Sequence, residues 1–154
     1  MTKTMLAALL FSSTFAVQAF DLISAGEFGD ELEMRKFKDI DAVGATRDIP
    51  PPYPKIEIIS PNLGSEIKPP VKIEVRFIGE NGVAINPDSF KVNYGVLGID
   101  ITARIRKATE IKMDGFTAEG AALPEGKHSL KLTLSDAEGR TTTSTLKFKI
   151  IEAE

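Results

Sequence analysis

Apolar and polar side chains alternate along most of this chain, and the alternation is most regular between residues 123 and 150. Leu130, Leu132 and Leu134 are separated by single polar residues, and the pattern resumes at Leu146, beyond an Asp-Ala-Glu-Gly turn. Because successive side chains of a strand point to opposite faces, this pattern predicts a β-hairpin with one apolar face. A lone hairpin is marginally stable in water, so that face must pack against a second sheet. The hairpin therefore predicts a β-sandwich.

The same alternation predicts further strands upstream, separated by turns rich in proline and glycine. The clearest follows Pro69-Pro70, where Val71, Val75 and Phe77 are expected to point into the core. We find no helical period after Pro54, so the expected fold is all-β with about seven antiparallel strands. Besides the hairpin, the expected strands cover residues 55–60, 71–77, 89–96, 99–105 and 110–113, the last leading into 116–118.

Residues 1–19 have the three parts of a secretory signal peptide. Lys3 precedes an apolar run that begins at Met5, and Val17-Gln18-Ala19 places small residues at the two positions that a signal peptidase reads. The alternative, a membrane-spanning helix, would need a longer run without the break at Ser12-Ser13-Thr14. We therefore expect cleavage after Ala19, export to the periplasm or beyond, and no stable membrane insertion after cleavage.

Charge divides the remaining chain into two parts. Residues 20–54 contain 8 acidic and 4 basic side chains, a net charge of −4, whereas residues 55–154 contain 14 of each. Since neither part is basic, nucleic acid and anionic membrane surfaces are not expected partners. The acidic tail ends in Pro-Pro-Pro-Tyr-Pro at 50–54, which favours an extended spacer over a ligand for a proline-recognition domain.

The chain contains no cysteine. Disulfides, thiolate zinc sites, cysteine nucleophiles and a thiol-linked lipid anchor are therefore excluded. We predict no cofactor and no metal. A domain of about 100 residues is large enough for one hydrophobic core, and here packing alone must stabilise it.

Two segments resemble the immunoglobulin-like domains of bacteria. They are Ile-Ile-Ser-Pro-Asn-Leu-Gly-Ser at 58–65, and 123–139, where a Pro-Glu-Gly corner leads into a strand that ends in an Asp-x-x-Gly turn. The resemblance covers 55–154 and implies an immunoglobulin-like sandwich, preceded by the signal peptide (1–19) and the acidic tail (20–54). The whole layout is similar to small exported proteins of proteobacteria. It implies no functional residue, because this fold supports adhesion, scaffolding, enzyme accessory and chaperone roles alike.

The sequence does not favour calcium binding or hydrolysis. Asp136 and Glu138 share a turn that could hold calcium, but two carboxylates fall short of the six to eight oxygens that calcium takes, and Asp136 can instead accept hydrogen bonds within its own turn. His128 is the one histidine, and its neighbour Ser129 must point to the opposite face of the strand. We therefore predict that the protein is not an enzyme; a cofactor-free hydrolase remains a weak alternative.

The acidic tail contains the first candidate partner-binding segment. Ser24-Ala25-Gly26-Glu27 matches a capping box, and Ile23 and Phe28 flank it as a hydrophobic staple does. A helix from this point to about Lys38 would place Leu32 on the same stripe as Phe28. We expect residues 21–37 to be mostly mobile in the isolated protein and to fold against a partner; the alternative is a disordered leader without a partner.

A second candidate lies in Val92–Ile101, where glycines flank Val96 and Leu97. An exposed turn would present these two side chains as an apolar docking surface, whereas a tight corner would bury them. The functional hypothesis is a monomeric, non-catalytic interaction module of the bacterial cell envelope that binds another protein. The alternative is a carbohydrate-binding accessory domain. Sugar-binding surfaces use exposed aromatic rings, and the chain has no tryptophan and only two tyrosines, Tyr53 and Tyr94, which counts against this alternative.

Overall fold

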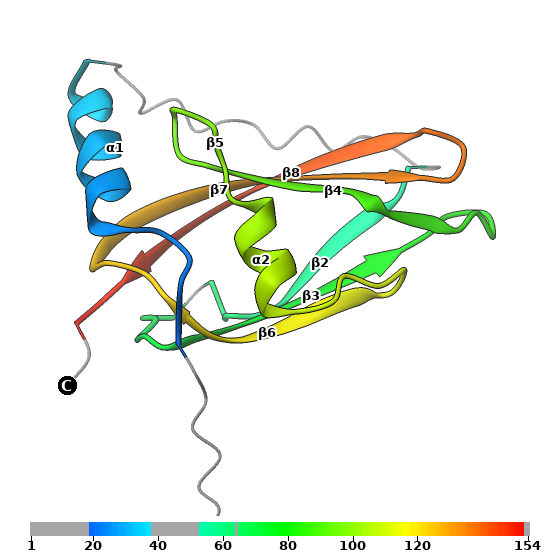
Figure 1. Ribbon diagram of the computed structural model, residues 1–154. Coiled ribbons are helices and arrows are strands. Elements are labelled where there is room, and N and C mark those ends of the chain that lie inside the picture. The colour runs from blue at the N-terminus through cyan, green and yellow to red at the C-terminus, as the bar shows by residue number, and fades with distance from the viewer. Residues whose placement is uncertain (1–18, 38–52, 64, 153–154) are drawn as a thin grey trace, which may run out of the picture.

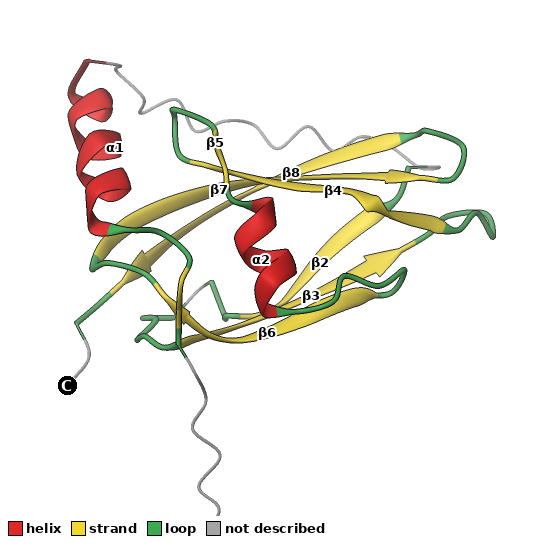
Figure 2. Ribbon diagram, viewed as in Figure 1, coloured by secondary structure: helices red, strands yellow, loops and turns green. Residues whose placement is uncertain are grey.

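The computed structural model describes residues 19–37, 53–63 and 65–152, which form two four-stranded sheets packed face to face (Figures 1 and 2). The expected β-sandwich is confirmed. Sheet A contains, in spatial order, β1 (Phe20–Asp21), β6 (Gly115–Ala122), β3 (Val71–Ile78) and β2 (Lys55–Ser60). Sheet B contains β5 (Ile99–Asp100), β4 (Ile85–Tyr94), β7 (Gly126–Asp136) and β8 (Thr141–Ile150). Two helices, α1 (Ala25–Phe37) and α2 (Thr102–Ala108), complete the described elements.

The hairpin that dominates the sequence pattern is present as β7 and β8, paired antiparallel over ten residues of each strand. Its leucines at 130, 132 and 134 are all buried, as are Leu146 and Ile150 on β8. They pack in a core that also contains the rings of Phe77 and Phe116 from sheet A and of Phe90 from β4 of sheet B, whose centroids lie 5.2–6.3 Å apart. The alternation therefore assigned the core face of the hairpin correctly.

The expected strand at 99–105 is wrong. β5 ends at Asp100, whose carboxylate accepts a hydrogen bond from the Thr102 amide at 2.9 Å, and the chain then turns into α2. Ile101 and Ile105 are both buried, and a spacing of four residues places two side chains on one face of a helix as well as of a strand. The helix closes the side of the sandwich between β4 and β6 (Figure 2).

The expected short strand at 110–113 is also wrong. This stretch contributes one isolated bridge, between Lys112 and Gly115, and the regular strand β6 starts at Gly115. Gly115 has a φ of +127°, and a β-carbon there would lie 2.0 Å from the Val75 carbonyl oxygen. The glycine allows β6 to turn tightly against β3.

Residues 20–37 depart most from the sequence-based expectation, which treated them as a mobile tail outside a domain starting at 55. β1 pairs in parallel with β6, and the Leu22 amide donates to the Ala122 carbonyl at 3.0 Å. Leu22 and Ile23 are buried in the core, with 0% and 2% of their surface exposed. This segment therefore belongs to the folded domain, because sheet A and the core are incomplete without it.

The expected signal peptide, apart from Ala19, and most of the proline-rich run lie outside the described residues. Within the described part of the chain, neither helix is long and apolar enough to cross a bilayer.

Candidate partner-binding site

Helix α1 begins with the capping box that the sequence predicts. The Glu27 amide donates to the Ser24 hydroxyl oxygen at 3.3 Å, and the Glu27 carboxylate accepts from the Ser24 amide at 3.0 Å. Two backbone N–H groups that the first turn leaves unpaired are thereby satisfied. The box fixes where the helix starts and points the Glu27 carboxylate at the neighbouring helix.

Arg104 of α2 ties the two helices together. Its guanidinium donates to both carboxylate oxygens of Glu27, at 2.5 and 2.8 Å, and to the Leu22 carbonyl at 2.8 Å. These hydrogen bonds outweigh the effect of burial and lower the pKa of the Glu27 carboxyl to about 2. Arg104 therefore holds both the end of β1 and the start of α1.

The Glu27–Arg104 pair predicts a loss of stability in acid. The pKa of Glu27 is lower in the folded chain, at about 2, than the ordinary value of 4.5, so its stabilising effect is complete above about pH 4.5 and disappears toward pH 2. We expect the urea midpoints of the natural protein and of Glu27→Gln to differ at pH 7 and to converge toward pH 2.5. A difference that stays constant over this range would show that the ionised pair contributes nothing.

Glu31 is the second anchor of α1, and its carboxylate is fully buried. Both oxygens accept from the Val96 amide, at 2.8 and 2.9 Å, and one accepts from Nε of Arg35 at 3.0 Å. Arg35 also donates to the Lys127 carbonyl at 3.3 Å. An ionised carboxylate can be buried here because charge-assisted hydrogen bonds replace its water. The turn that follows β4 is thereby fastened to α1.

Gly95 makes this contact possible. It has a φ of +65°, and a β-carbon at this position would lie 2.2 Å from a carboxylate oxygen of Glu31. Gly98, in the same turn, has a nearly identical φ of +66° but has nothing within 4 Å of the position of a β-carbon. A side chain would be strained by the backbone conformation at both positions, but only at position 95 would it also collide with Glu31.

We expect Gly95→Ala to destabilise the protein more than Gly98→Ala. Each alanine is strained by about 1–2 kcal/mol in the left-handed region, but the alanine at 95 must also displace Glu31 from the Val96 amide. Thermal unfolding of the two variants measures the difference. Equal melting temperatures would contradict the close approach of Glu31 to Gly95.

An aromatic cluster supports the inner face of α1. The Phe28 ring lies 4.9 Å from the ring of His128, which also packs against Phe148 at 5.6 Å and Tyr94 at 5.8 Å. Nε2 of His128 lies 2.8 Å from the Pro124 carbonyl, which can only accept, so Nε2 carries the proton and Nδ1 accepts from the Tyr94 hydroxyl at 3.1 Å. Burial lowers the pKa of His128 and raises the pKa of Tyr94 to about 12. Both groups are therefore neutral structural partners at pH 7.

The five residues that the sequence singles out fall into two groups. Ile23 is buried, and the Phe28 ring packs against the His128 ring, so both side chains belong to the packing of this segment on the sandwich. Leu32 on α1 and Leu97 in the turn after β4 are 41% and 43% exposed, and Val96 between the two anchors is half-buried. The Glu31–Val96 hydrogen bonds place the turn that carries Val96 and Leu97 beside the part of α1 that carries Leu32, although the two segments lie far apart in the sequence.

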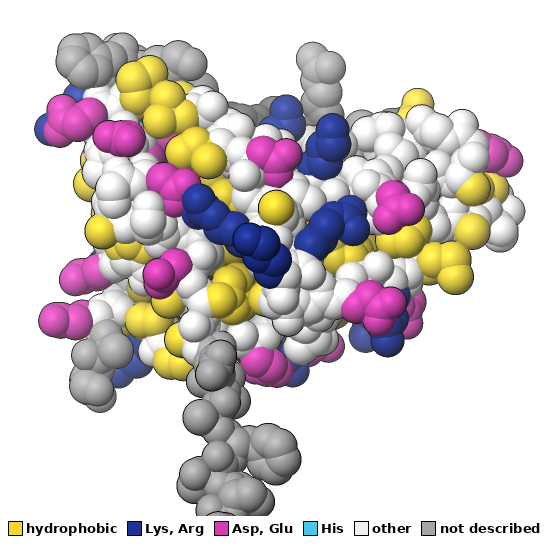
Figure 3. Space-filling model, viewed as in Figure 1, with side chains coloured by type: hydrophobic (Ala, Val, Ile, Leu, Met, Phe, Trp, Pro, Cys, Tyr) yellow, Lys and Arg dark blue, Asp and Glu magenta, His cyan; other side chains and the backbone are white. Residues whose placement is uncertain are grey.

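We call Leu32, Val96 and Leu97 the α1–turn patch. Hydrophobic side chains gather at this corner of the molecule, beside acidic side chains of α1 (Figure 3). Sequence patterns singled out the three patch residues and the glycine at 95 but missed Glu31 and Arg104, which hold α1 in place. Glu31 carries no signal that separates it from the other acidic residues of the tail, and only the glycine at 95 hints at a close approach.

In the turn between β7 and β8, the Asp136 carboxylate is hydrogen-bonded within the turn itself. One oxygen of Asp136 accepts from the amides of Glu138 and Arg140, both at 3.0 Å, and the other accepts from Nε of Arg140 at 2.6 Å. Burial raises the pKa of this carboxyl, but the hydrogen bonds outweigh that effect and hold the pKa below its ordinary value. This geometry matches the turn alternative rather than a calcium ligand. Across the described residues, three or more potential ligand side chains do not gather at any point.

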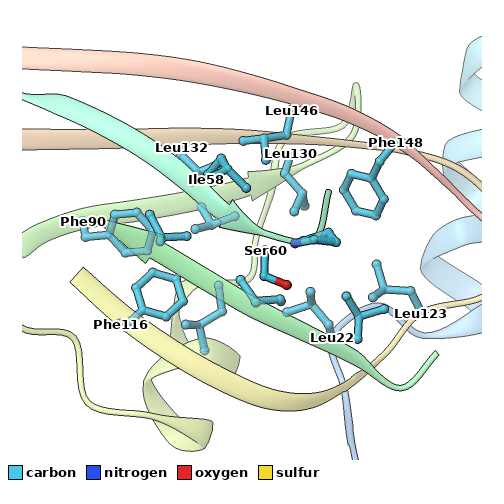
Figure 4. Close-up of a pocket in the computed structure, with 16 residues that line it drawn as sticks. Leu22, Ile58, Ser60, Phe90, Phe116, Leu123, Leu130, Leu132, Leu146 and Phe148 are labelled. Atoms are coloured by element: carbon cyan, nitrogen blue, oxygen red, sulfur yellow. The ribbon is translucent and has the colours of Figure 1, made fainter. Parts of the chain in front are cut away.

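A cavity of about 30 Å³ lies between the sheets, and its lining is apolar except for Ser60 (Figure 4). The Ser60 hydroxyl donates to the Lys72 carbonyl at 3.1 Å. Ligand pockets usually measure about 300–1,000 Å³ and carry a few polar groups that orient the ligand. The cavity is therefore a packing gap of the core rather than a substrate site.

Comparisons with known proteins found only distant structural similarities to this chain. No family model matches it, and neither does any curated protein. Among solved structures, CopC from Methylosinus trichosporium OB3b is 12% identical with a TM-score of 0.41, over 65% of this chain and 97% of CopC. An engineered protein is 19% identical with a TM-score of 0.44, over 66% of this chain and 21% of that chain. Likenesses this distant do not bear on function.

Proposed function

We propose that this protein is an exported, non-catalytic, immunoglobulin-like module of the bacterial cell envelope that binds another protein through the α1–turn patch. The observation that carries the proposal is the pair of exposed leucines, Leu32 and Leu97, held on two fastened elements by the buried carboxylate of Glu31. Apolar anchors on a preorganised surface lose little conformational freedom when they bind. Export follows from the signal-like residues 1–19.

The non-catalytic part of the proposal rests on how the reactive groups are used. Both ring nitrogens of His128 are hydrogen-bonded, and its side chain is 2% exposed. Ser129 pairs with Lys147 on the opposite face of β7, so it does not approach the imidazole. General base catalysis needs a ring nitrogen within reach of a substrate, which this arrangement withholds.

The carbohydrate-binding alternative requires an exposed aromatic ring, and Tyr94 does not provide one. Tyr94 is fully buried, and its hydroxyl bonds His128, so its ring cannot stack on a sugar. Tyr53 is half-buried next to the buried Pro54. An exposed protein-binding patch is therefore the better-supported function.

A photo-crosslinking amino acid placed at residue 32 or 97 of the full chain, in the native cell, tests the proposal. Met113, in the turn after α2 and 62% exposed, is the matched control for an exposed apolar side chain elsewhere. We expect one discrete crosslinked protein shared by positions 32 and 97 and missing at 113. Identical products from all three positions, or none from 32 and 97, would refute the proposal.

Leu97→Asp should separate binding from folding. The side chain lies at the surface, so we expect the melting temperature to change little and affinity for the crosslinked protein to fall at least about fivefold, as for a residue that contributes over ~1 kcal/mol. Unchanged affinity, measured by titration, would remove Leu97 from the site.

A further inference from the structure

The outer face of sheet B carries five lysines from three adjacent strands. The register places Lys131 opposite Thr145 and Asn93, Lys127 opposite Lys149, Lys147 opposite Ser129, and Lys91 opposite Thr133. Residues directly opposite in a ladder share a face, so all five side chains leave the sheet on the side away from the core. We call Lys91, Lys127, Lys131, Lys147 and Lys149 the lysine face; each is exposed.

These lysines do not form the ion pairs with described residues that basic side chains form elsewhere on the sandwich. On sheet A, Lys72 lies 2.9 Å from Glu74, and Arg76 lies 3.7 Å from Glu57. None of the five lysines forms an ion pair with a described residue. The register adds one carboxylate to this face, Asp100 on β5 beyond Asn93. It accepts a hydrogen bond from the Thr102 amide, and its pKa is lowered by hydrogen bonds from Thr102 and also by the nearby charge of Lys91.

The lysine face places like charges close together, and the protection of an exposed strand edge explains only some of these lysines. Lys127 and Lys149 are directly opposite, and like charges in that position destabilise a sheet. Lysines on an edge strand such as β8 deter pairing with another chain, which accounts for Lys147 and Lys149. Lys91, Lys127 and Lys131 lie on β4 and β7, which have strands on both sides, so edge protection does not account for them.

The shape and chemistry of the face limit what can bind it. Each step from Lys91 to Lys131 and on to Lys147 crosses one strand and advances two residues, about 8 Å from strand spacings. Between them stand hydroxyls of Ser129, Thr133 and Thr145. The residues that the register places on this face include no aromatic or aliphatic side chain. Bases and sugars find no stacking platform here, and a peptide finds no apolar anchor.

We propose that the lysine face docks electrostatically on an anionic lipid bilayer. A flat anionic surface can meet all five ammonium groups at once, whereas a rod or a single acidic segment reaches only some of them. Clusters of four to eight basic residues recognise anionic lipids in this way. Docking is peripheral, because the face has nothing apolar to insert. The sequence analysis did not expect anionic membranes as partners because residues 55–154 contain 14 basic and 14 acidic side chains. The fold, however, gathers five of the basic side chains on one face.

Co-sedimentation of the full chain with vesicles tests this proposal. The vesicles contain phosphatidylcholine and phosphatidylglycerol in equal parts, with pure phosphatidylcholine for comparison. We expect binding to the anionic vesicles only, and its loss in about 1 M salt, where the Debye length is ~3 Å. Because one lysine near an anionic surface contributes about fivefold in affinity, Lys131→Glu with Lys147→Glu should weaken binding by at least about 25-fold.

The matched control is Lys107→Glu with Lys112→Glu, which makes the same change in net charge at exposed positions on α2 and the following turn. If the reversed variant fails to fold, glutamine at 131 and 147 replaces glutamate. Failure of the natural protein to bind anionic vesicles, or equal losses in both pairs, would overturn the proposal. Tighter, face-dependent binding to duplex DNA or heparin at the same salt would overturn the assignment to lipid.

Discussion

Replacing Leu132 with alanine is expected to lower the free energy of unfolding by about 2–5 kcal/mol. Leu132 is 3% exposed in the middle of β7 and lines the cavity between the sheets. Its removal withdraws buried apolar surface and enlarges a void that the core already contains, and the cost of such substitutions rises with the volume left empty. Since small domains are stable by only about 5–15 kcal/mol, urea unfolding should show a large fall in the midpoint.

Lys131→Ala is the control for this experiment. Lys131 is the neighbouring residue on the opposite face of β7, and the expected change is within about 0.5 kcal/mol. Similar losses in the two variants would contradict the register of β7, because a slip of one residue exchanges the two faces of a strand.

Glu31→Ala is expected to cost about 2–4 kcal/mol. The substitution leaves the Val96 amide without its acceptor and Arg35 without its ion pair. Breaking a fully buried ion pair costs ~3–5 kcal/mol. We expect the smaller loss of about 2–4 kcal/mol because the Arg35 side chain is 27% exposed and can regain water.

Glu33→Ala on the same helix is the control. Glu33 pairs with Lys36, but its side chain is 64% exposed, and exposed pairs of this kind contribute about 0.3–0.5 kcal/mol. Urea midpoints that do not distinguish Glu31→Ala from Glu33→Ala would show that α1 is not anchored by the buried carboxylate.

Period-two alternation predicted the hairpin and the strands at 55–60 and 71–77, because each has one face in the core and one in water. It failed at 99–105, where Ile101 and Ile105 suit a helix and a strand equally, and the outcome depends on the Asp100 and Thr102 hydrogen bonds. Local pattern could not distinguish the two.

The docking of α1 depends on partners that are distant in the sequence. Capping chemistry located the start of the helix, since Ser24 and Glu27 are three residues apart. Glu31 and Glu27 bind residues 65 and 77 positions away, Val96 and Arg104, and no local pattern records such pairs. The lysine face was hidden for the same reason: its residues come from three strands, and a charge count along the chain shows only their neutral sum.

Amide hydrogen exchange at Val96 tests most directly whether residues 20–37 are part of the folded domain. The Val96 amide donates to Glu31 of α1, whereas the Leu97 amide, in the same turn, has no acceptor among the described residues. We expect Val96 to exchange far more slowly than Leu97, because it is exposed only when α1 detaches. If Val96 exchanges as fast as Leu97 while the Leu132 amide in β7 remains protected, α1 is undocked in solution and the anchored patch does not exist.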